Sequence, residues 1–156
     1  MNKHEFIERL IEERRNVLKA IEGVTDEEFC KPMAEGKWSI KDTLGHLTAW
    51  EAEVANAFEQ KARGERPTIG DIKDFDPWND AQAAKRKDNS AEEIRREFNE
   101  NRRRLLTIVN GLPEDESLWS PERSTSKLLN VIIEHDRHHW KALCAHRQLD
   151  CAGKGM

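Results

Sequence analysis

The stretch Glu134-His135-Asp136-Arg137-His138-His139-Trp140 lies inside a longer run, residues 125–147, that has helical periodicity. Side chains four residues apart lie on one face of a helix, so His135 and His139 are expected to point the same way. They belong to a stripe of mostly apolar residues whose directions around the helix axis differ by no more than roughly 60°. This predicts that both histidines face the core. The stripe consists of Leu128, Ile132, His135, His139, Leu143 and His146. Two imidazoles one turn apart can bind one metal ion, but a tight site needs a third ligand.

Three other segments also have apolar residues at helical spacing, with signals for where each helix begins and ends. They cover about residues 3–22, 40–63 and 91–110. Ser39 with Asp42, and Ser90 with Glu93, have the spacing of capping boxes. We also expect a helical turn near 26–29 and a short helix over about 77–87. Four long helices with a long connection between the second and the third predict an all-α four-helix bundle.

His46, on the second long helix, is the expected third ligand. It lies roughly 100° from the centre of the apolar stripe of that helix, on a face that also carries Trp50 and Glu53. Neighbouring bundle helices lie about 8–10 Å apart, which lets imidazoles from two helices meet one ion. Glu53 is the nearest candidate for a general base, but about 10 Å along the helix separates it from His46.

The alternative for each histidine is an ordinary buried or half-buried side chain without an ion. His138 lies to one side of the pair and is expected at the surface, and His146 lies about 10 Å beyond His139. Asp42 and Asp136 are expected either to orient the imidazoles or to be charges on the helix surface. The nearby tryptophans are expected to pack in the core or to line a pocket; they are Trp38, Trp50 and Trp140.

A site of three histidines leaves coordination positions open, which is typical of catalytic rather than structural sites. Nitrogen ligands suit zinc, nickel, copper, cobalt or iron. We expect a divalent ion, with zinc first and nickel as its rival. The sequence does not choose between them.

Composition limits the classes of protein and partner. The chain has 156 residues and a formal net charge of −4, which gives no reason to expect a nucleic-acid partner. No segment is apolar enough for a transmembrane helix or a signal peptide, so we expect a cytoplasmic protein. The arginines of the third long helix alternate with glutamates, which predicts a solvated helix face. The three cysteines, Cys30, Cys144 and Cys151, are expected to be free thiols because their spacing suggests no disulfide framework.

The pattern WSxxDxxGHLxxWE, residues 38–51, together with His135-x-x-x-His139, resembles the DinB/YfiT-like superfamily. The middle of the chain, from Asp76-Pro77-Trp78-Asn79 onward, is most similar to the ClbS/DfsB branch. The resemblance implies a single bundle domain over 1–150, in up-up-down-down order with a long crossover between helices 2 and 3, and a tail over 151–156. It also implies a divalent metal on His46, His135 and His139, and a homodimer.

The resemblance leaves several functions open. One is a metal-dependent enzyme, either a hydrolase or a transferase that uses a low-molecular-weight thiol, acting on a small electrophile. The second is a bundle that sequesters a toxic or stress-related small molecule without turning it over. The third is a structural bundle whose histidines have lost their metal. No residue of the chain specifies a thiol or a substrate.

Overall fold

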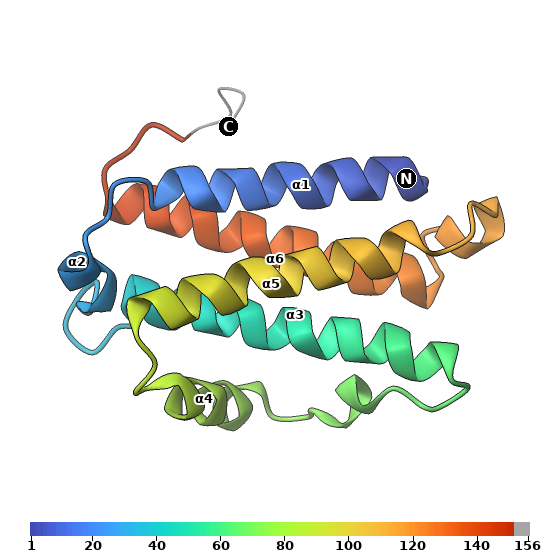
Figure 1. The fold of residues 1–156 in the computed structure, drawn as a ribbon, viewed down its shortest axis with the longest axis horizontal. Coiled ribbons are helices and arrows are strands. Elements are labelled where there is room, and N and C mark those ends of the chain that lie inside the picture. The colour runs from blue at the N-terminus through green and yellow to red at the C-terminus, as the bar shows by residue number, and fades with distance from the viewer. Residues whose placement is uncertain (152–156) are drawn as a thin grey trace. The chain divides into compact units, whose positions relative to one another are not determined.

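The computed structural model describes residues 1–151, which form α-helices and short 3-10 helices without any β-strand among them. The four long helices are α1 (Lys3–Ala20), α3 (Ile40–Ala62), α5 (Ala91–Asn110) and α6 (Ser124–His146). The shorter ones are α2 (Asp26–Cys30), η1 (Thr68–Asp71), α4 (Phe75–Arg86) and η2 (Glu116–Trp119). The prediction of an all-α fold built on four long helices is confirmed (Figure 1).

The chain divides into two compact units. The terminal unit combines residues 1–25 with the chain from residue 109 onward, and the central unit is residues 26–108. A single domain over 1–150 and the up-up-down-down order of the helices stay predictions. Of the predicted tail, 151–156, only Cys151 belongs to the described residues.

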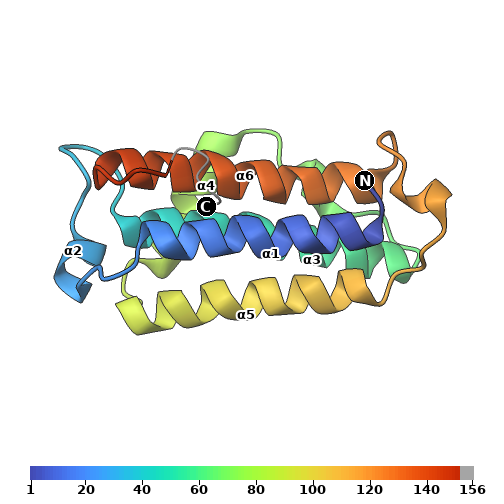
Figure 2. The same ribbon diagram turned by 90° about the horizontal axis from the view of Figure 1, so that it is seen from above.

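In the terminal unit, α1 and α6 pack side by side and run in the same direction (Figures 1 and 2). The residue numbers of the contacting pairs increase together along the two helices: Arg14 contacts Asp136, and farther along Arg147 contacts Ala20. Fully buried apolar side chains come from both helices: Phe6, Leu10 and Val17 from α1, and Leu129 and Leu143 from α6. Burial of each such side chain contributes about 1.5–3 kcal/mol.

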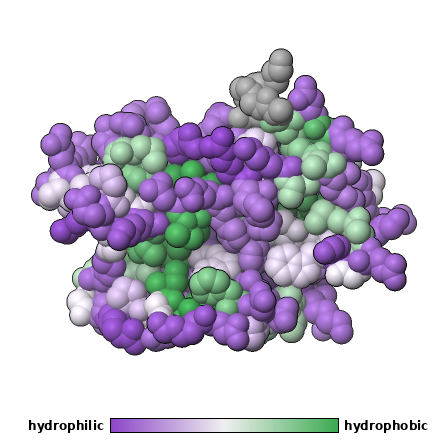
Figure 3. Space-filling model, turned by 180° about the vertical axis from the view of Figure 1, so that it is seen from behind, coloured by the Kyte–Doolittle hydropathy of each residue, from purple (hydrophilic) through white to green (hydrophobic). Residues whose placement is uncertain are grey.

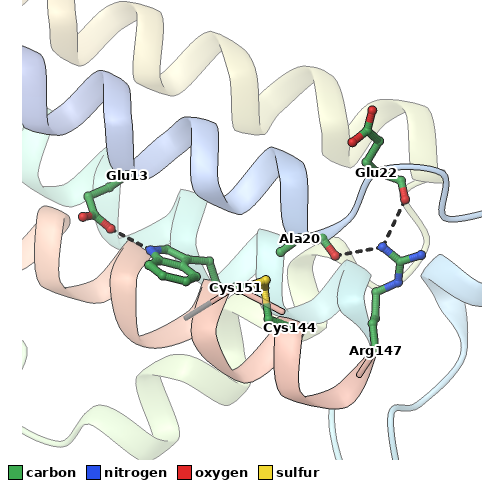
Figure 4. The surroundings of a disulfide bond; sticks show 7 residues. Glu13, Ala20, Glu22, Cys144, Arg147 and Cys151 are labelled. Atoms are coloured by element: carbon green, nitrogen blue, oxygen red, sulfur yellow. Dashed lines mark hydrogen bonds between the residues drawn. A yellow bond between two sulfur atoms is a disulfide. The ribbon is translucent and has the colours of Figure 1, made fainter. Parts of the chain in front are cut away.

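Polar side chains satisfy both ends of α1. The Asn2 side chain accepts a hydrogen bond of 2.9 Å from the backbone N–H of Glu5. At the other end, Arg147 donates from Nη1 to the carbonyls of Ala20 and Glu22, at 2.9 and 3.0 Å (Figure 4). The Glu5 N–H and the Ala20 carbonyl are groups that a helix end leaves without intrahelical partners, and Glu22 lies just beyond the helix. The helix ends two residues before the predicted boundary.

In the central unit, α3 contacts α2, η1 and α4. Its first turn has the predicted capping box, in which Ser39 Oγ accepts from the Asp42 N–H and Asp42 Oδ2 accepts from the Ser39 N–H, both at 3.0 Å. The helix ends at Ala62, one residue before the prediction. Gly64 follows at φ +75°, a conformation that favours glycine.

The crossover between α3 and α5 contains η1 and α4. The predicted short helix began two residues too late, because Pro77 is in the first turn of α4, where a helix needs no N–H donor, and not at its first position. Trp50 holds α4 against α3: its Nε1 donates to Asn79 Oδ1 at 2.8 Å, and its ring lies 4.3 Å from the Trp78 ring.

The prediction of a solvated arginine face on α5 was wrong for Arg102. Its side chain is 5 % exposed and pairs with Glu51 of α3, which is 1 % exposed. Removing one partner from such a buried pair typically costs about 3–5 kcal/mol, because it leaves an uncompensated charge. Glu51 lies on α3, among mostly apolar residues. The spacing of the arginines on α5 does not by itself identify which of them pairs with Glu51.

The prediction of three free thiols was also wrong, because Cys144 and Cys151 form a disulfide (Figure 4). After α6 the chain turns back through Gln148, at φ 57°, and brings the two Cα atoms to 6.0 Å. That distance is common for disulfides. The free cysteine among residues 1–151 is Cys30, which is exposed.

None of the helices within residues 1–151 is both long enough and apolar enough to span a membrane. Hydrophilic side chains cover most of the face drawn in Figure 3, and hydrophobic ones gather in a narrower band.

Candidate metal centre

The terminal unit brings His135 and His139 together on α6. Their ring centroids are 4.8 Å apart and their planes are inclined by 73°. This is the arrangement expected for residues one turn apart on a helix. The predicted pair is therefore present, with two imidazoles on one face.

The predicted stripe placed the pair facing the core. In the structure the pair lies at the edge of the core. The buried side chains of α6 include Leu129, Ile133, Asp136 and Trp140, whereas Leu128 and both histidines are half-buried. Ile132 and Leu143 of the predicted stripe are buried, as predicted, but the centre of the buried stripe is rotated away from Leu128 and the two histidines. Half-buried imidazoles are partly removed from water and still accessible.

The pKa of His135 is lowered from 6.5 to about 4. Burial is the largest cause, because it disfavours the charged imidazolium. The neighbouring His139 lowers the pKa further, Asp136 raises it, and His138 lowers it. His135 is consequently neutral at pH 7, which is the form in which histidine binds a metal.

Asp136, between the two histidines in sequence, is not a charge on the helix surface. Its side chain is 2 % exposed, and its Oδ2 lies 4.0 Å from Nε of Arg14 on α1. A buried carboxylate needs such a partner. Of the two alternatives for Asp136, the surface charge is thus wrong, and a role in orienting an imidazole stays a prediction.

His46 lies on α3 in the central unit and is half-buried. The Trp38 ring packs against it, with ring centroids 4.8 Å apart and an interplanar angle of 53°. Trp38 precedes the Ser39 cap, so the start of α3 fixes the place of both rings. The neighbouring Gly45 allows close approach of α4, because a Cβ there would lie 3.0 Å from Cδ of Arg86.

The remaining candidates are His138, His146 and Glu53. His138 is exposed, as predicted, with its ring 5.0 Å from that of His139. His146 is exposed at the end of α6. Glu53 is half-buried on α3, seven residues beyond His46, and its role as a base stays a prediction.

Sequence reasoning found the histidines but missed the residues that support them. The sequence predicts Trp38 as a pocket wall or as part of the core, and its contact with the His46 ring is found only in the structure, because Trp38 lies outside the helix that carries His46. The hydrogen bond of 2.7 Å from Trp140 Nε1 to Glu13 Oε2 joins α6 to α1. No signal in the sequence identified that pair, because 127 residues separate its members.

Comparison with known proteins gives one match. The family model of the DinB superfamily matches residues 9–143. The comparisons with curated proteins and with solved structures give no significant match.

Proposed function

Because the chain belongs to the DinB superfamily, we propose that His46, His135 and His139 bind one divalent metal ion in a metal-dependent enzyme. The enzyme acts on a small electrophile, by thiol transfer or by hydrolysis. The matched region, 9–143, includes all three histidines. This supports treating them as parts of one site.

One observation carries the proposal. Each of the three histidines offers a ring nitrogen, and together they are a group that could hold a metal ion. Three nitrogen ligands fit zinc or nickel and leave coordination positions for a substrate. His135, neutral at pH 7, has a lone pair available without first losing a proton.

When bound, a divalent ion supplies a Lewis acid that makes a water or a thiol nucleophilic at neutral pH. The protein orients the imidazoles. His135 and His139 are held one turn apart by α6, and the Trp38 ring limits the rotation of His46. Glu53 is proposed as a base, although about 10 Å of helix separates it from His46.

A second candidate function is sequestration of a small molecule without turnover, as in the ClbS/DfsB branch. The aromatic cluster of the central unit favours it: Trp50 lies 4.3 Å from the Trp78 ring and 5.4 Å from the Phe75 ring. Phe75 is 58 % exposed and offers an apolar surface for a ligand. Such a protein would keep its affinity for the ligand after removal of the metal.

Elemental analysis of the untagged protein tests the metal site. We expect about one equivalent of metal in the parent and in His138→Ala, an exposed neighbour that serves as the matched control. The double variant His135→Ala/His139→Ala and the single variant His46→Ala are expected to lose it. Retention of the metal by both of these variants would exclude the site.

We also propose that the protein is a cytoplasmic homodimer that acts on a small molecule. Light scattering of the purified protein measures the oligomeric state, and a mass equal to one chain would exclude the dimer.

A further inference from the structure

The terminal unit contains a groove, of about 680 Å³, that the metal proposal does not use. It lies along α1 and α6 and is bordered by the turn after α6. Both cysteines of the disulfide line it, and none of the histidines discussed above does. Its volume is within the range of sites for small molecules, about 300–1,000 Å³.

The turn that carries the disulfide is held by backbone hydrogen bonds. The N–H of Leu149 donates to the carbonyl of Cys144 at 2.9 Å, and Gln148 has the left-handed conformation typical of a helix C-terminus. Cys151 is 6 % exposed and Cys144, within α6, is 2 % exposed. Both cysteines are therefore largely covered, Cys151 slightly less than Cys144, and Figure 4 shows the bond between them.

The groove is lined by three basic and three acidic side chains, and of the basic ones Arg137 and Lys141 are the candidates to bind an anion. Arg137, Lys141 and Cys144 are spaced four and three residues apart, so they share a face of α6. Within the described part of the chain, neither Arg137 nor Lys141 forms an ion pair, although both line the groove.

The acidic residues of the groove on α1 are already paired. Glu13 accepts from Arg9 at 3.3 Å and from Trp140 at 2.7 Å, and Glu12 pairs with Arg15 at 2.8 Å. On α1 and α6, the charges of the groove outside an ion pair are therefore those of Arg137 and Lys141, and Nζ of Lys141 also lies 5.8 Å from the Trp140 ring. Asp150, in the turn after α6, adds a carboxylate to the lining.

A buried amide in the groove also lacks a partner. Asn16 is 2 % exposed and lines the groove, and its Oδ1 has no hydrogen bond to any residue from 1 to 151. Buried polar atoms of native proteins are nearly always hydrogen-bonded. A ligand that donates a hydrogen bond would satisfy this oxygen.

We propose that this groove binds a small anionic thiol, which exchanges with the Cys144–Cys151 disulfide. The thiolate of the bound molecule attacks Sγ of Cys151, forming a mixed disulfide, and Cys144 leaves as a thiolate. A second thiolate attacks the mixed disulfide and releases the oxidised small disulfide. Two small thiols lose one electron each, and the protein disulfide gains both as two thiolates, which take up protons from solvent.

The surroundings of Cys144 suit its part in this exchange. Arg137 and Lys141 on the same face stabilise both the incoming anion and the departing thiolate. Cys144 lies in the last turn of α6, where the helix end opposes a negative charge, so the thiolate depends on Arg137 and Lys141 to offset this effect. The exchange also accounts for a disulfide in a cytoplasmic protein, where disulfides are usually transient and redox-active. The inference does not depend on the metal site.

Alkylation of the unreduced, denatured protein counts the thiols. If Cys144 and Cys151 are joined as a disulfide, only Cys30 is alkylated and one adduct is expected. Three adducts would overturn the proposal. The exchange is then measured in the Cys30→Ser background by intact mass, with two thiols of similar size and opposite charge. These are 3-mercaptopropionate and cysteamine, with each rate expressed per thiolate.

We expect 3-mercaptopropionate to react about tenfold faster or more than cysteamine, the size of effect that local charge has on encounter rates. Arg137→Gln/Lys141→Gln should abolish this preference. The control Lys127→Gln/Arg103→Gln removes the same charge from exposed sites outside the groove and should retain it. Equal rates in the parent, or a preference that survives in the groove variant, would overturn the proposal.

Discussion

A single residue, His135, links the candidate site to the stability of the protein through its proton. In the folded protein its pKa is about 4, against 6.5 for an unperturbed histidine. Between these values the unfolded chain binds a proton that the folded chain does not. Metal-free protein should therefore lose stability as the pH falls through this window, and regain it as the pH rises.

Urea unfolding of metal-free protein at about pH 7 and about pH 5 measures this effect. The free energy of unfolding of the parent should fall more steeply with acid than that of His135→Gln, which has no imidazole to protonate. Identical slopes would mean that His135 is not the group responsible. With metal present, protons should also compete for the imidazoles, so acid should release the ion.

The sequence identified the histidines but not the residues that contact them, because the two depend on different kinds of information. The i, i+4 relation of His135 and His139 is a property of one helix and can be predicted from spacing. Arg14 beside Asp136 and Trp38 beside His46 depend on packing between elements, which spacing within one helix does not report.

At the scale of elements, the capping box of α3 links helix stability to the candidate site. Ser39 begins the helix, Trp38 precedes it, and the Trp38 ring packs on His46. Ser39→Ala should destabilise the protein by about 1 kcal/mol, the usual cost of losing a helix cap. It should also weaken metal binding, because the ring that restrains His46 loses its anchor.

The matched control is Ser90→Ala, which removes the other capping box, at the start of α5. Ser90 precedes α5, which carries none of the three proposed ligands. Its loss should lower stability by a similar amount and leave metal affinity unchanged, as measured by competition with a chelator. Equal losses of affinity in both variants would refute the specific role of the α3 cap.

Helix boundaries could be predicted within one or two residues wherever a local signal marks them. The caps at Ser39 and Ser90 act through neighbours in sequence, so their effect is visible in the pattern. The start of α4 was misplaced because Asp76-Pro77 looked like a boundary, whereas Trp50 and Asn79 hold this segment in place. Contacts of that kind between distant residues are invisible to local signals.

At the scale of the whole molecule, the proposed ion would link ligands from both units. Binding at about a hundredfold excess over Kd should add about 2.7 kcal/mol, or a rise in Tm of about 5–10 °C for a chain of this size. Thermal unfolding followed by calorimetry, with and without zinc, measures the shift. His135→Ala/His139→Ala should show none, while His138→Ala should behave as the parent.

The disulfide is the feature at this scale that the sequence did not predict. Cys144 and Cys151 are separated by six residues and match no metal or disulfide pattern. Their approach depends on the turn through Gln148, a residue type that rarely takes a left-handed conformation. Neither composition nor spacing signals such a turn.

The terminal unit has a consequence for how the chain folds as it is made. Its first helix must find a partner that lies more than a hundred residues later, as the contact between Glu13 and Trp140 shows with a separation of 127. At about 5–20 residues per second, α1 waits for many seconds on the ribosome with its apolar face unpartnered. The central unit is continuous in sequence and is complete before α6 emerges. The nascent chain therefore exposes α1 for the longest time, and this helix is where a chaperone would bind first.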